Sequence, residues 1–418
     1  MSTVSLRTQA SPPPTAPEER RLEVSQLQPG MYVCRLDRPW GDSPFSAPGL
    51  QLAGSDDIAA LQRLCEFVYI DAHRAPPRDG RLLQRTELAA GRFVHGARHA
   101  DEVSFADELP RAQAAMQNAS AMVEALFKDI ANGRILSVAQ VEEVVLPLVA
   151  SVLRNPDAFI WVECLRGHDD YAYRHALRAS ALAAAFGRHM GFAESTVVSL
   201  AAGALLMDVG KRRLPQALLQ YEGTLARDQV DLLRTHVAHS LEIVTAAGIT
   251  DPDVLDIVRS HHERDDGRGY PDRLRGSAIP MGARMLGIID AYDAMISPRP
   301  YRPALSRYQA MRELYAARDS LFPGDLVDQF QACLGVYPTG SLVQLNSGAV
   351  ALVMAQNPAR RLRPRVMLLS TATGQPAASF QVLDLMRQDE HKPQLDIART
   401  LAAGSYDTRA VQSVLDQG

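Results

Sequence analysis

The chain has 418 residues, of which 46% are hydrophobic and 22% are charged, and its formal net charge is −4 at pH 7. This is the composition of an ordinary globular protein with enough material for two to four domains. The small negative charge provides no global field that would attract nucleic acid or an anionic membrane, so any anionic substrate must be held by a local site.

Nothing in the sequence predicts secretion or membrane insertion. The first residues lack the apolar segment of a signal peptide, and no apolar run reaches the length of about 18 residues that a membrane span needs. The four cysteines are scattered, without a closely spaced pair that would indicate a disulfide framework or a thiolate zinc site. We therefore expect a cytoplasmic protein with reduced thiols.

The N-terminal part predicts a tail, a small domain and a linker. Residues 1–20 are rich in Pro, Ser and Thr and predict a disordered tail. The segment VSQLQPGMYVCRLD predicts two strands around a Pro-Gly turn, and SDDIAALQRLCEFVYIDA predicts a capped helix that leads into a strand. Residues 21–72 are thus expected to form a small α+β domain, and the Arg- and Gly-rich residues 73–104 a linker.

The rest of the chain divides into helical and β-rich parts. Residues 105–165 predict a helical connector, in which AMVEALFKDIANG ends on a glycine C-cap. Residues 166–335 predict a longer helical block, and residues 336–418 a small module of short strands joined by polar turns. The expected fold class is multidomain: an all-α domain flanked by a small α+β N-terminal domain and a small β-rich C-terminal module.

The helical block contains most of the histidines. Seven of the eleven lie within residues 168–262. His175 shares one helical face with apolar residues at i+4, i+7 and i+11, and His261 continues an apolar stripe next to His262. In the helix that leads to this pair, Asp251 is expected as N-cap, followed by a proline at the first helical position.

Carboxylates interrupt apolar runs in the same block. Asp208 ends the run LLMD, Asp290 ends MLGIID, and Asp293 follows one turn later. A lone histidine, even His175, is better explained as a satisfied core or surface residue. Several buried imidazoles and carboxylates together are costly unless they are paired or bind a metal, and this donor set suits zinc, iron or manganese.

The motifs of this block resemble those of a known family. YAYRHALR, LLMDVGK, THVAH, HHERDDGRGYP, ARMLGIIDAYDAM and PRPYRPALS have the order and spacing found in HD-GYP phosphodiesterases. Members of this family are metal-dependent hydrolases of the bacterial messenger cyclic di-GMP. The resemblance covers roughly residues 168–335 and implies an all-α HD-type catalytic domain. The preceding residues look like the small domain that often precedes it.

The resemblance also implies roles for individual residues. Asp208 would bridge two metal ions and, with Lys211, serve in catalysis. Lys211 and Arg302 would contact the substrate phosphate. The complete set of implied metal ligands is His175, Asp208, His236, His261, His262 and Asp290.

The glycine-rich loop that gives the family part of its name has implied roles as well. Gly269, Tyr270 and Pro271 would bind substrate, and in the family this loop is associated with docking onto diguanylate cyclase domains. The implied partners are therefore cyclic di-GMP and a cyclase domain. No nucleic-acid polymer is expected, and a homodimer is left open.

One residue departs from the family pattern at the centre of the site. Met207 stands where the histidine of the His-Asp pair is expected. A thioether is a soft donor that binds Mn²⁺ or Fe²⁺ poorly, and the lost imidazole would serve the metal held by His175, Asp208 and Asp290. We expect iron or manganese as cofactor, with one ion bound tightly and a second one weakly.

Other departures limit the site. Tyr171 replaces a glutamate that supports a third metal in some members, so two metals are the maximum. After His236 the usual Pro-Glu-x-Gly is replaced by residues 237–240, in which His239 is a weak additional ligand candidate, and Asp265 replaces an aromatic residue.

Three functions remain open from the sequence. The first is hydrolysis of cyclic di-GMP by an enzyme that Met207 weakens. The second is a catalytically inactive receptor or adaptor of cyclic di-GMP signalling that acts through protein contacts. The third is a phosphohydrolase of mononucleotides, against which the intact Gly-Tyr-Pro loop argues.

Overall fold

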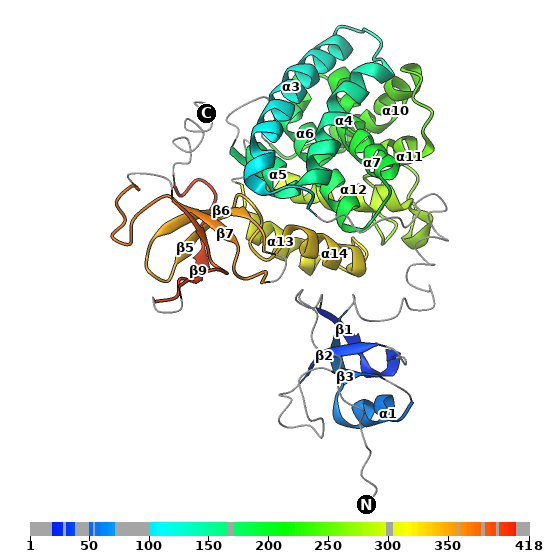
Figure 1. Cartoon of the computed structure of the whole chain (residues 1–418). Coiled ribbons are helices and arrows are strands. Elements are labelled where there is room, and N and C mark those ends of the chain that lie inside the picture. Colours follow the sequence, from blue (N-terminus) through cyan, green and yellow to red (C-terminus); the bar gives the residue numbers. More distant parts are fainter. Residues whose placement is uncertain are drawn as a thin grey trace, which may run out of the picture. The chain divides into compact units, whose positions relative to one another are not determined.

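The computed structural model describes most of the chain (Figure 1). The described residues are 19–27, 31–37, 50–52, 55–71, 101–165, 171–221, 223–297, 304–357, 360–377, 381–389 and 393–406. The chain forms two compact units, one within residues 1–85 and the other mainly within residues 86–357 and 361–418. Nearly all of the expected tail and most of the expected linker lie outside the described residues.

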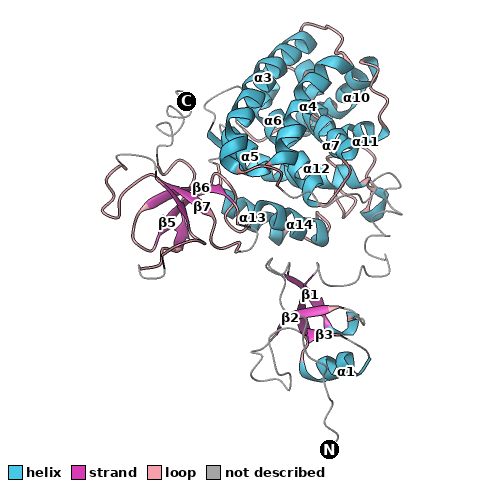
Figure 2. Ribbon diagram, viewed as in Figure 1, coloured by secondary structure: helices cyan, strands magenta, loops and turns pink. Residues whose placement is uncertain are grey.

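The N-terminal unit contains a four-stranded antiparallel sheet and a helix (Figure 2). Its elements are β1 (Glu19–Glu23), the 3-10 helix η1 (Val24–Gln26), β2 (Tyr32–Leu36), β3 (Leu50–Gln51), α1 (Ser55–Leu64) and β4 (Phe67–Asp71). The expected helix followed by a strand is confirmed by α1 and β4. The sheet begins at Glu19, two residues before the expected domain boundary.

The expected pair of strands around the Pro-Gly turn is wrong. The first expected strand forms a 3-10 helix at Val24–Gln26 instead, and the strand before it, β1, pairs with β4 rather than with β2, in the order β1-β4-β2-β3. Val68 and Ile70 of β4 are buried, as are Val33 and Leu36 of β2, so the two central strands both contribute to the core of this unit.

The second unit is dominated by helices. They are α3 (Phe105–Ala131), α4 (Val138–Arg154), α5 (Pro156–Leu165), α6 (Tyr171–His189), α7 (Glu194–Leu206), η3 (Val209–Arg213), α8 (Gln216–Leu219), α9 (Arg227–Arg234), α10 (His236–Ala246), α11 (Pro252–Ser260), η4 (Gly276–Ala278), α12 (Met281–Ile296), α13 (Arg307–Ala316) and α14 (Gly324–Leu334). The expected start of α11 is confirmed, since the Asp251 side chain accepts a hydrogen bond from the amide of Asp253 at 2.9 Å. Gly133 ends α3 with a φ of +75°, as a glycine C-cap requires.

One apolar core joins these helices. It runs from Ala112 in α3 to Leu334 in α14 and includes Phe186 and Met207. The segment that we expected to act as a connector, residues 105–165, therefore contributes to the same core as the helices of the histidine cluster.

The C-terminal module is a five-stranded antiparallel sheet of order β8-β7-β6-β5-β9. Its strands are β5 (Leu342–Leu345), β6 (Val350–Ala355), β7 (Arg365–Leu368), β8 (Val382–Asp384) and β9 (Ile397–Thr400). Trp161 and Leu165 of α5 share an apolar cluster with residues of β5, β6 and β7, so this sheet packs directly on the helical domain. In the described part of the chain, no helix combines the length and apolarity needed to cross a membrane.

Candidate metal centre and the adjoining pocket

The predicted ligands come together from distant parts of the helical domain. Asp208 lies between the end of α7 and η3, His236 begins α10, and His261 and His262 follow α11. They form two groups of metal-ligating side chains that share Asp208. We call Asp208, His236, His261 and His262 the four-donor group, and His175, Asp208 and Asp290 the three-donor group.

The four-donor group is compact. Nε2 of His236 lies 3.2 Å from Oδ1 of Asp208, and Nε2 of His261 lies 3.7 Å from the same oxygen. Nε2 of His262 is 3.2 Å from Nε2 of His236. Donor atoms about 2.1 Å from one ion lie about 3.0–3.4 Å apart at tetrahedral or octahedral angles. The two distances of 3.2 Å fit ligands of a common cation, and the distance of 3.7 Å is a little longer.

Main-chain carbonyls orient two of these imidazoles. Nδ1 of His236 lies 2.7 Å from the carbonyl oxygen of Leu233, and Nδ1 of His261 lies 3.1 Å from that of Val258. With the ring proton donated there, each Nε2 keeps its lone pair for a metal. Nε2 of His261 is buried and has no hydrogen-bond partner among the described residues, which is the state expected of a metal donor.

The three-donor group offers fewer ligands. Nε2 of His175 lies 3.3 Å from Oδ2 of Asp208 and 3.7 Å from Oδ1 of Asp290. Met207 precedes Asp208, is fully buried and belongs to the apolar core. The buried position that carries a histidine in the family pattern is therefore filled by an apolar side chain.

A buried carboxylate orients His175. Oδ2 of Asp293 lies 2.6 Å from Nδ1 of His175, and Oδ1 of Asp293 accepts a hydrogen bond of 2.8 Å from Arg178. Although burial alone would raise the pKa of Asp293, Arg178 and His175 hold that pKa well below its usual range. Sequence reasoning placed Asp293 one turn after Asp290 but missed this role, because the contact joins residues 118 positions apart.

The charge of Asp208 is stabilised in the same way. Burial opposes ionisation, but Lys211 and the neighbouring rings of His175, His236 and His261 keep the pKa of Asp208 well below its usual value. Lys211 pairs directly with Oδ2 of Asp208. Burial, followed by the neighbouring His261, keeps the pKa of His262 well below its usual range, so His262 is neutral and able to coordinate.

Gly210 allows these segments to approach each other. A β-carbon at this position would lie 2.1 Å from the carbonyl oxygen of His236 and 2.4 Å from the amide of Ser240, which no side chain could tolerate. The Gly210 amide donates to the Ser240 hydroxyl at 2.8 Å. Ser240, which departs from the family pattern, thus fastens η3 to α10 and holds Asp208 beside His236.

The Gly-Tyr-Pro loop packs against the four-donor group. A β-carbon on Gly269 would lie 2.4 Å from the Cα of Glu263, so only glycine fits there. The ring of Tyr270 stacks on His262 with centroids 4.6 Å apart. Burial, followed by the charges of Asp208 and Asp290, raises the pKa of the Tyr270 hydroxyl, which therefore stays protonated.

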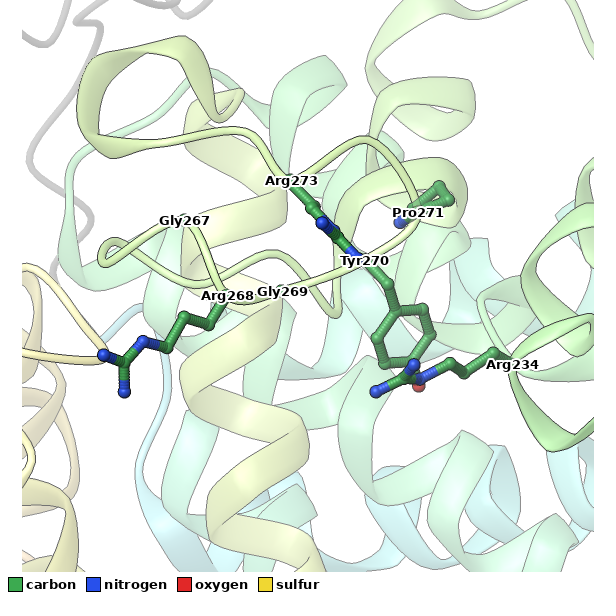
Figure 3. A pocket seen from close by; sticks show the side chains of 7 residues that line it. All are labelled: Arg234, Gly267, Arg268, Gly269, Tyr270, Pro271 and Arg273. Atoms are coloured by element: carbon green, nitrogen blue, oxygen red, sulfur yellow. The ribbon is translucent and has the colours of Figure 1, made fainter. Parts of the chain in front are cut away.

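An arginine-rich pocket of about 460 Å³ opens beside this loop (Figure 3). It is lined by Arg234, Gly267, Arg268, Gly269, Tyr270, Pro271 and Arg273. The Arg234 guanidinium lies over the Tyr270 ring, 5.1 Å from its centroid. Three arginines next to a candidate metal centre suit an anionic ligand with planar bases. Arg234 was missed from the sequence because it belongs to no motif there.

The remaining residues that the sequence singled out either lie outside the described residues or take no part in the donor groups. Arg302 lies outside the described residues, as does the side chain of Tyr171. Nδ1 of His239 lies 3.7 Å from a carboxylate oxygen of Glu242, and His239 belongs to neither group of donors found in the described residues. In the loop, Gly269 is buried whereas Pro271 is exposed.

Three family models match consecutive parts of the chain. A domain of unknown function, DUF3391, matches residues 19–141. An HD domain matches residues 162–326. A KOW domain associated with the HD domain matches residues 342–399. The HD match includes both donor groups and the Gly-Tyr-Pro loop.

Several characterised proteins are similar to this chain. The cyclic di-GMP phosphodiesterase PA4108 of Pseudomonas aeruginosa is 31% identical over 376 residues, which are 88% of this chain and 89% of the relative. The cyclic di-GMP phosphodiesterase response regulator RpfG of Xanthomonas campestris is 33% identical over 39% of this chain and 46% of its own length. A 3′3′-cGAMP-specific phosphodiesterase of Vibrio cholerae is 33% identical over 33% of this chain and 27% of its own length. With the assembled donor groups and the HD domain match, the first of these similarities shows that the chain belongs to the HD-GYP family of metal-dependent phosphodiesterases.

Proposed function

We propose that this enzyme hydrolyses cyclic di-GMP to the linear dinucleotide and onward to GMP, with an activity that Met207 weakens. The observation that carries the proposal is the complete four-donor group, in which His236, His261 and His262 meet Asp208. The similarity to phosphodiesterases of cyclic di-GMP over most of the chain supports the choice of substrate.

The donor groups suit Fe²⁺ or Mn²⁺, because imidazole and carboxylate together favour these ions. Two such ions, when bound, lower the pKa of water and offset charge on the phosphodiester. We propose His236, His261 and His262 as ligands of a tight ion, His175 and Asp290 as ligands of a weak one, and Asp208 as a ligand of both.

The remaining site residues bind and orient the substrate. Lys211 lies beside Asp208, where its ammonium group can contact a phosphate oxygen, and Arg302 is proposed for the same task. The pocket beside the metal centre has the arginines and the aromatic ring to hold a guanine base or the second phosphate. Tyr270 links this pocket to the metal centre through its stacking on His262.

In the proposed reaction one phosphodiester of the ring is opened by water. The water oxygen forms a bond to phosphorus and loses a proton, while the bond from phosphorus to the 3′ oxygen breaks. The 3′ oxygen takes up a proton, so the product is a linear dinucleotide with a 5′ phosphate.

The alternative function is an inactive receptor or adaptor of cyclic di-GMP signalling. Met207 favours it, because a buried thioether replaces the imidazole expected beside Asp208. In this case the exposed Pro271 and the half-buried Tyr270 would contribute to a surface for a diguanylate cyclase domain.

Turnover of cyclic di-GMP by the full chain, prepared without oxygen and supplied with Mn²⁺ or Fe²⁺, separates the two functions. The enzyme should produce the linear dinucleotide slowly, and Asp208→Asn should abolish this activity because Asp208 belongs to both donor groups. A parallel assay with 3′3′-cGAMP determines which cyclic dinucleotide is preferred. A protein that binds metal and cyclic di-GMP but yields no product would support the adaptor instead.

A further inference from the structure

Glu163 is a buried carboxylate outside both donor groups. It lies in α5, and its side chain is 4% exposed. Arg178 of α6 donates from Nε to Oε1 of Glu163 at 2.6 Å and from Nη1 to Oδ1 of Asp293 at 2.8 Å. Asp293 in turn holds Nδ1 of His175 at 2.6 Å. An unbroken chain of hydrogen bonds therefore connects Glu163 with the three-donor group.

Stability alone is a weak explanation for this network. Buried ion pairs are often no more stabilising than apolar residues of similar volume, because each ion loses its hydration. For comparison, Glu108 pairs with Arg154, and the further hydrogen bond that Glu108 accepts comes from a neutral group, the hydroxyl of Ser151. The Glu163 network ends instead on a proposed metal ligand, where the orientation and basicity of the imidazole determine how well it binds.

At its other end the network reaches the C-terminal module. Nη2 of Arg307 lies 3.9 Å from Oε2 of Glu163. Gly340 packs against this arginine so closely that an added β-carbon would lie 3.0 Å from Nε of Arg307 and 2.6 Å from Sγ of Cys164. Gly340 belongs to the module, because its amide donates to the carbonyl of Val353 in β6 at 2.8 Å.

The module is fixed to the same helix by a second carboxylate, which is half-buried. Asp157 at the start of α5 accepts hydrogen bonds from the Thr339 hydroxyl at 3.0 Å and from the amide of Gln356 at 2.8 Å. Thr339, which precedes Gly340, and Gln356, whose side chain contacts Thr339, are thus anchored to α5. A displacement of the sheet would therefore be transmitted to Arg307 and Glu163.

We propose that Glu163 is a positioning residue of the three-donor group, and that the C-terminal β-module is coupled to that group through Gly340, Arg307, Glu163 and Arg178. Because Arg178 is shared between the carboxylates of Glu163 and Asp293, Asp293 keeps enough negative charge to hold the His175 proton on Nδ1. The inference rests on the proposed function only in taking His175 as a metal ligand.

The first test replaces Glu163 by glutamine, which keeps the shape and removes the charge. Glu163→Gln should weaken binding of the second, weaker Mn²⁺ about 10–100-fold, the usual cost of losing a partner that orients a ligand. The tight ion should stay bound. The matched control is Glu108→Gln, which also removes a buried charge from an arginine pair but has no link to His175, and should leave both ions unchanged.

A second measurement, made on the metal-free protein, tests the proposal even if the second ion does not bind. Nitrogen-15 shifts of the His175 ring in the metal-free full chain report which ring nitrogen carries the proton. The proton should be on Nδ1 in the wild type and in Glu108→Gln, and shared between the two nitrogens in Glu163→Gln. Unchanged His175 shifts in Glu163→Gln would overturn the proposal, whether or not a second ion binds.

The second test perturbs the module. Gly340→Ala should push on Arg307 and weaken binding of the second Mn²⁺ several-fold. Gly374→Ala is the control: Gly374 lies in the same module with a similar φ of +81°, against +85° for Gly340, but has open space around it. An alanine at 374 introduces the same backbone strain without the contact, so equal effects of the two variants would contradict the coupling.

The outcomes separate this inference from the proposed function. A chain that binds two ions but hydrolyses no cyclic dinucleotide would contradict the proposed function. The metal-binding and ring-proton measurements would still test the role of Glu163. If turnover is present and Glu163→Gln behaves as Glu108→Gln in every readout, the coupling is wrong and the enzyme proposal stands.

Discussion

The two donor groups share Asp208 but are built differently. In the four-donor group, two histidines are oriented by main-chain carbonyls of residues three positions earlier in the chain. In the three-donor group, His175 depends on Asp293, Arg178 and Glu163, which come from three helices. The first arrangement is local, whereas the second depends on long-range packing. A substitution at position 207 can therefore weaken one group while the other remains complete.

The largest expected effect breaks the complete group. His261→Ala removes a direct ligand without supplying a substitute, so the tightly held ion should be lost and turnover should fall to background. The loss of the ion is measured as metal content per chain, and the loss of turnover as the rate of cyclic di-GMP hydrolysis. The control is His189→Ala, since His189 lies 3.0 Å from the Gln329 side chain and belongs to neither donor group found in the described residues. If His261→Ala retains the tight ion, the four-donor group is not the site that binds it.

The next change repairs the incomplete group. Met207→His places an imidazole directly before Asp208, so the second ion should bind more tightly and turnover should rise by about 10–100-fold, or about 1.4–2.7 kcal/mol of barrier. Stability should fall without metal, because a buried histidine then has an unsatisfied ring nitrogen. Metal titration, turnover and thermal unfolding measure the three effects.

A matched control for this repair is Met207→Leu. It conserves volume and apolar character but offers no ligand, so it should leave metal binding and turnover unchanged. If Met207→His binds a second ion and still yields no product, the defect lies elsewhere and the adaptor function becomes the better account.

The smallest expected effect concerns neither donor group. Arg234→Ala removes a cation from the substrate pocket, so KM for cyclic di-GMP should rise several-fold, or about 1 kcal/mol of binding, while metal content stays constant. Arg134→Ala is the control, because Arg134 is also an exposed arginine paired with a nearby aspartate, here at 2.8 Å. A loss of metal in Arg234→Ala would show that the pocket and the metal centre are not separable.

Local signals in the sequence predicted much of this molecule. The cap at Asp251, the glycine end of α3 and the strands of the C-terminal module each depend on a few neighbouring residues, and all are present. The donor residues were named from the resemblance of their motifs to the HD-GYP family, and the fold brings them together.

The features that escaped prediction depend on contacts between distant segments. In the first sheet β4 pairs with both β1 and β2, which lie far from it in the sequence, and β9 pairs with β5 across more than fifty residues. Glu163 lies outside every motif, and Arg178 ends the motif YAYRHALR without an implied role. The contacts of both residues exist only because α5, α6 and α12 meet. The sequence offered one signal for these two residues, namely that a charged residue interrupts an apolar helical face.

The metal content of the wild-type chain, purified without oxygen and then titrated with Mn²⁺, tests the central claim most directly. A complete four-donor group beside an incomplete three-donor group predicts about one tightly held transition metal per chain and a second ion that binds weakly and exchanges. A protein that binds no metal under these conditions, or that holds two ions equally tightly, would contradict the account.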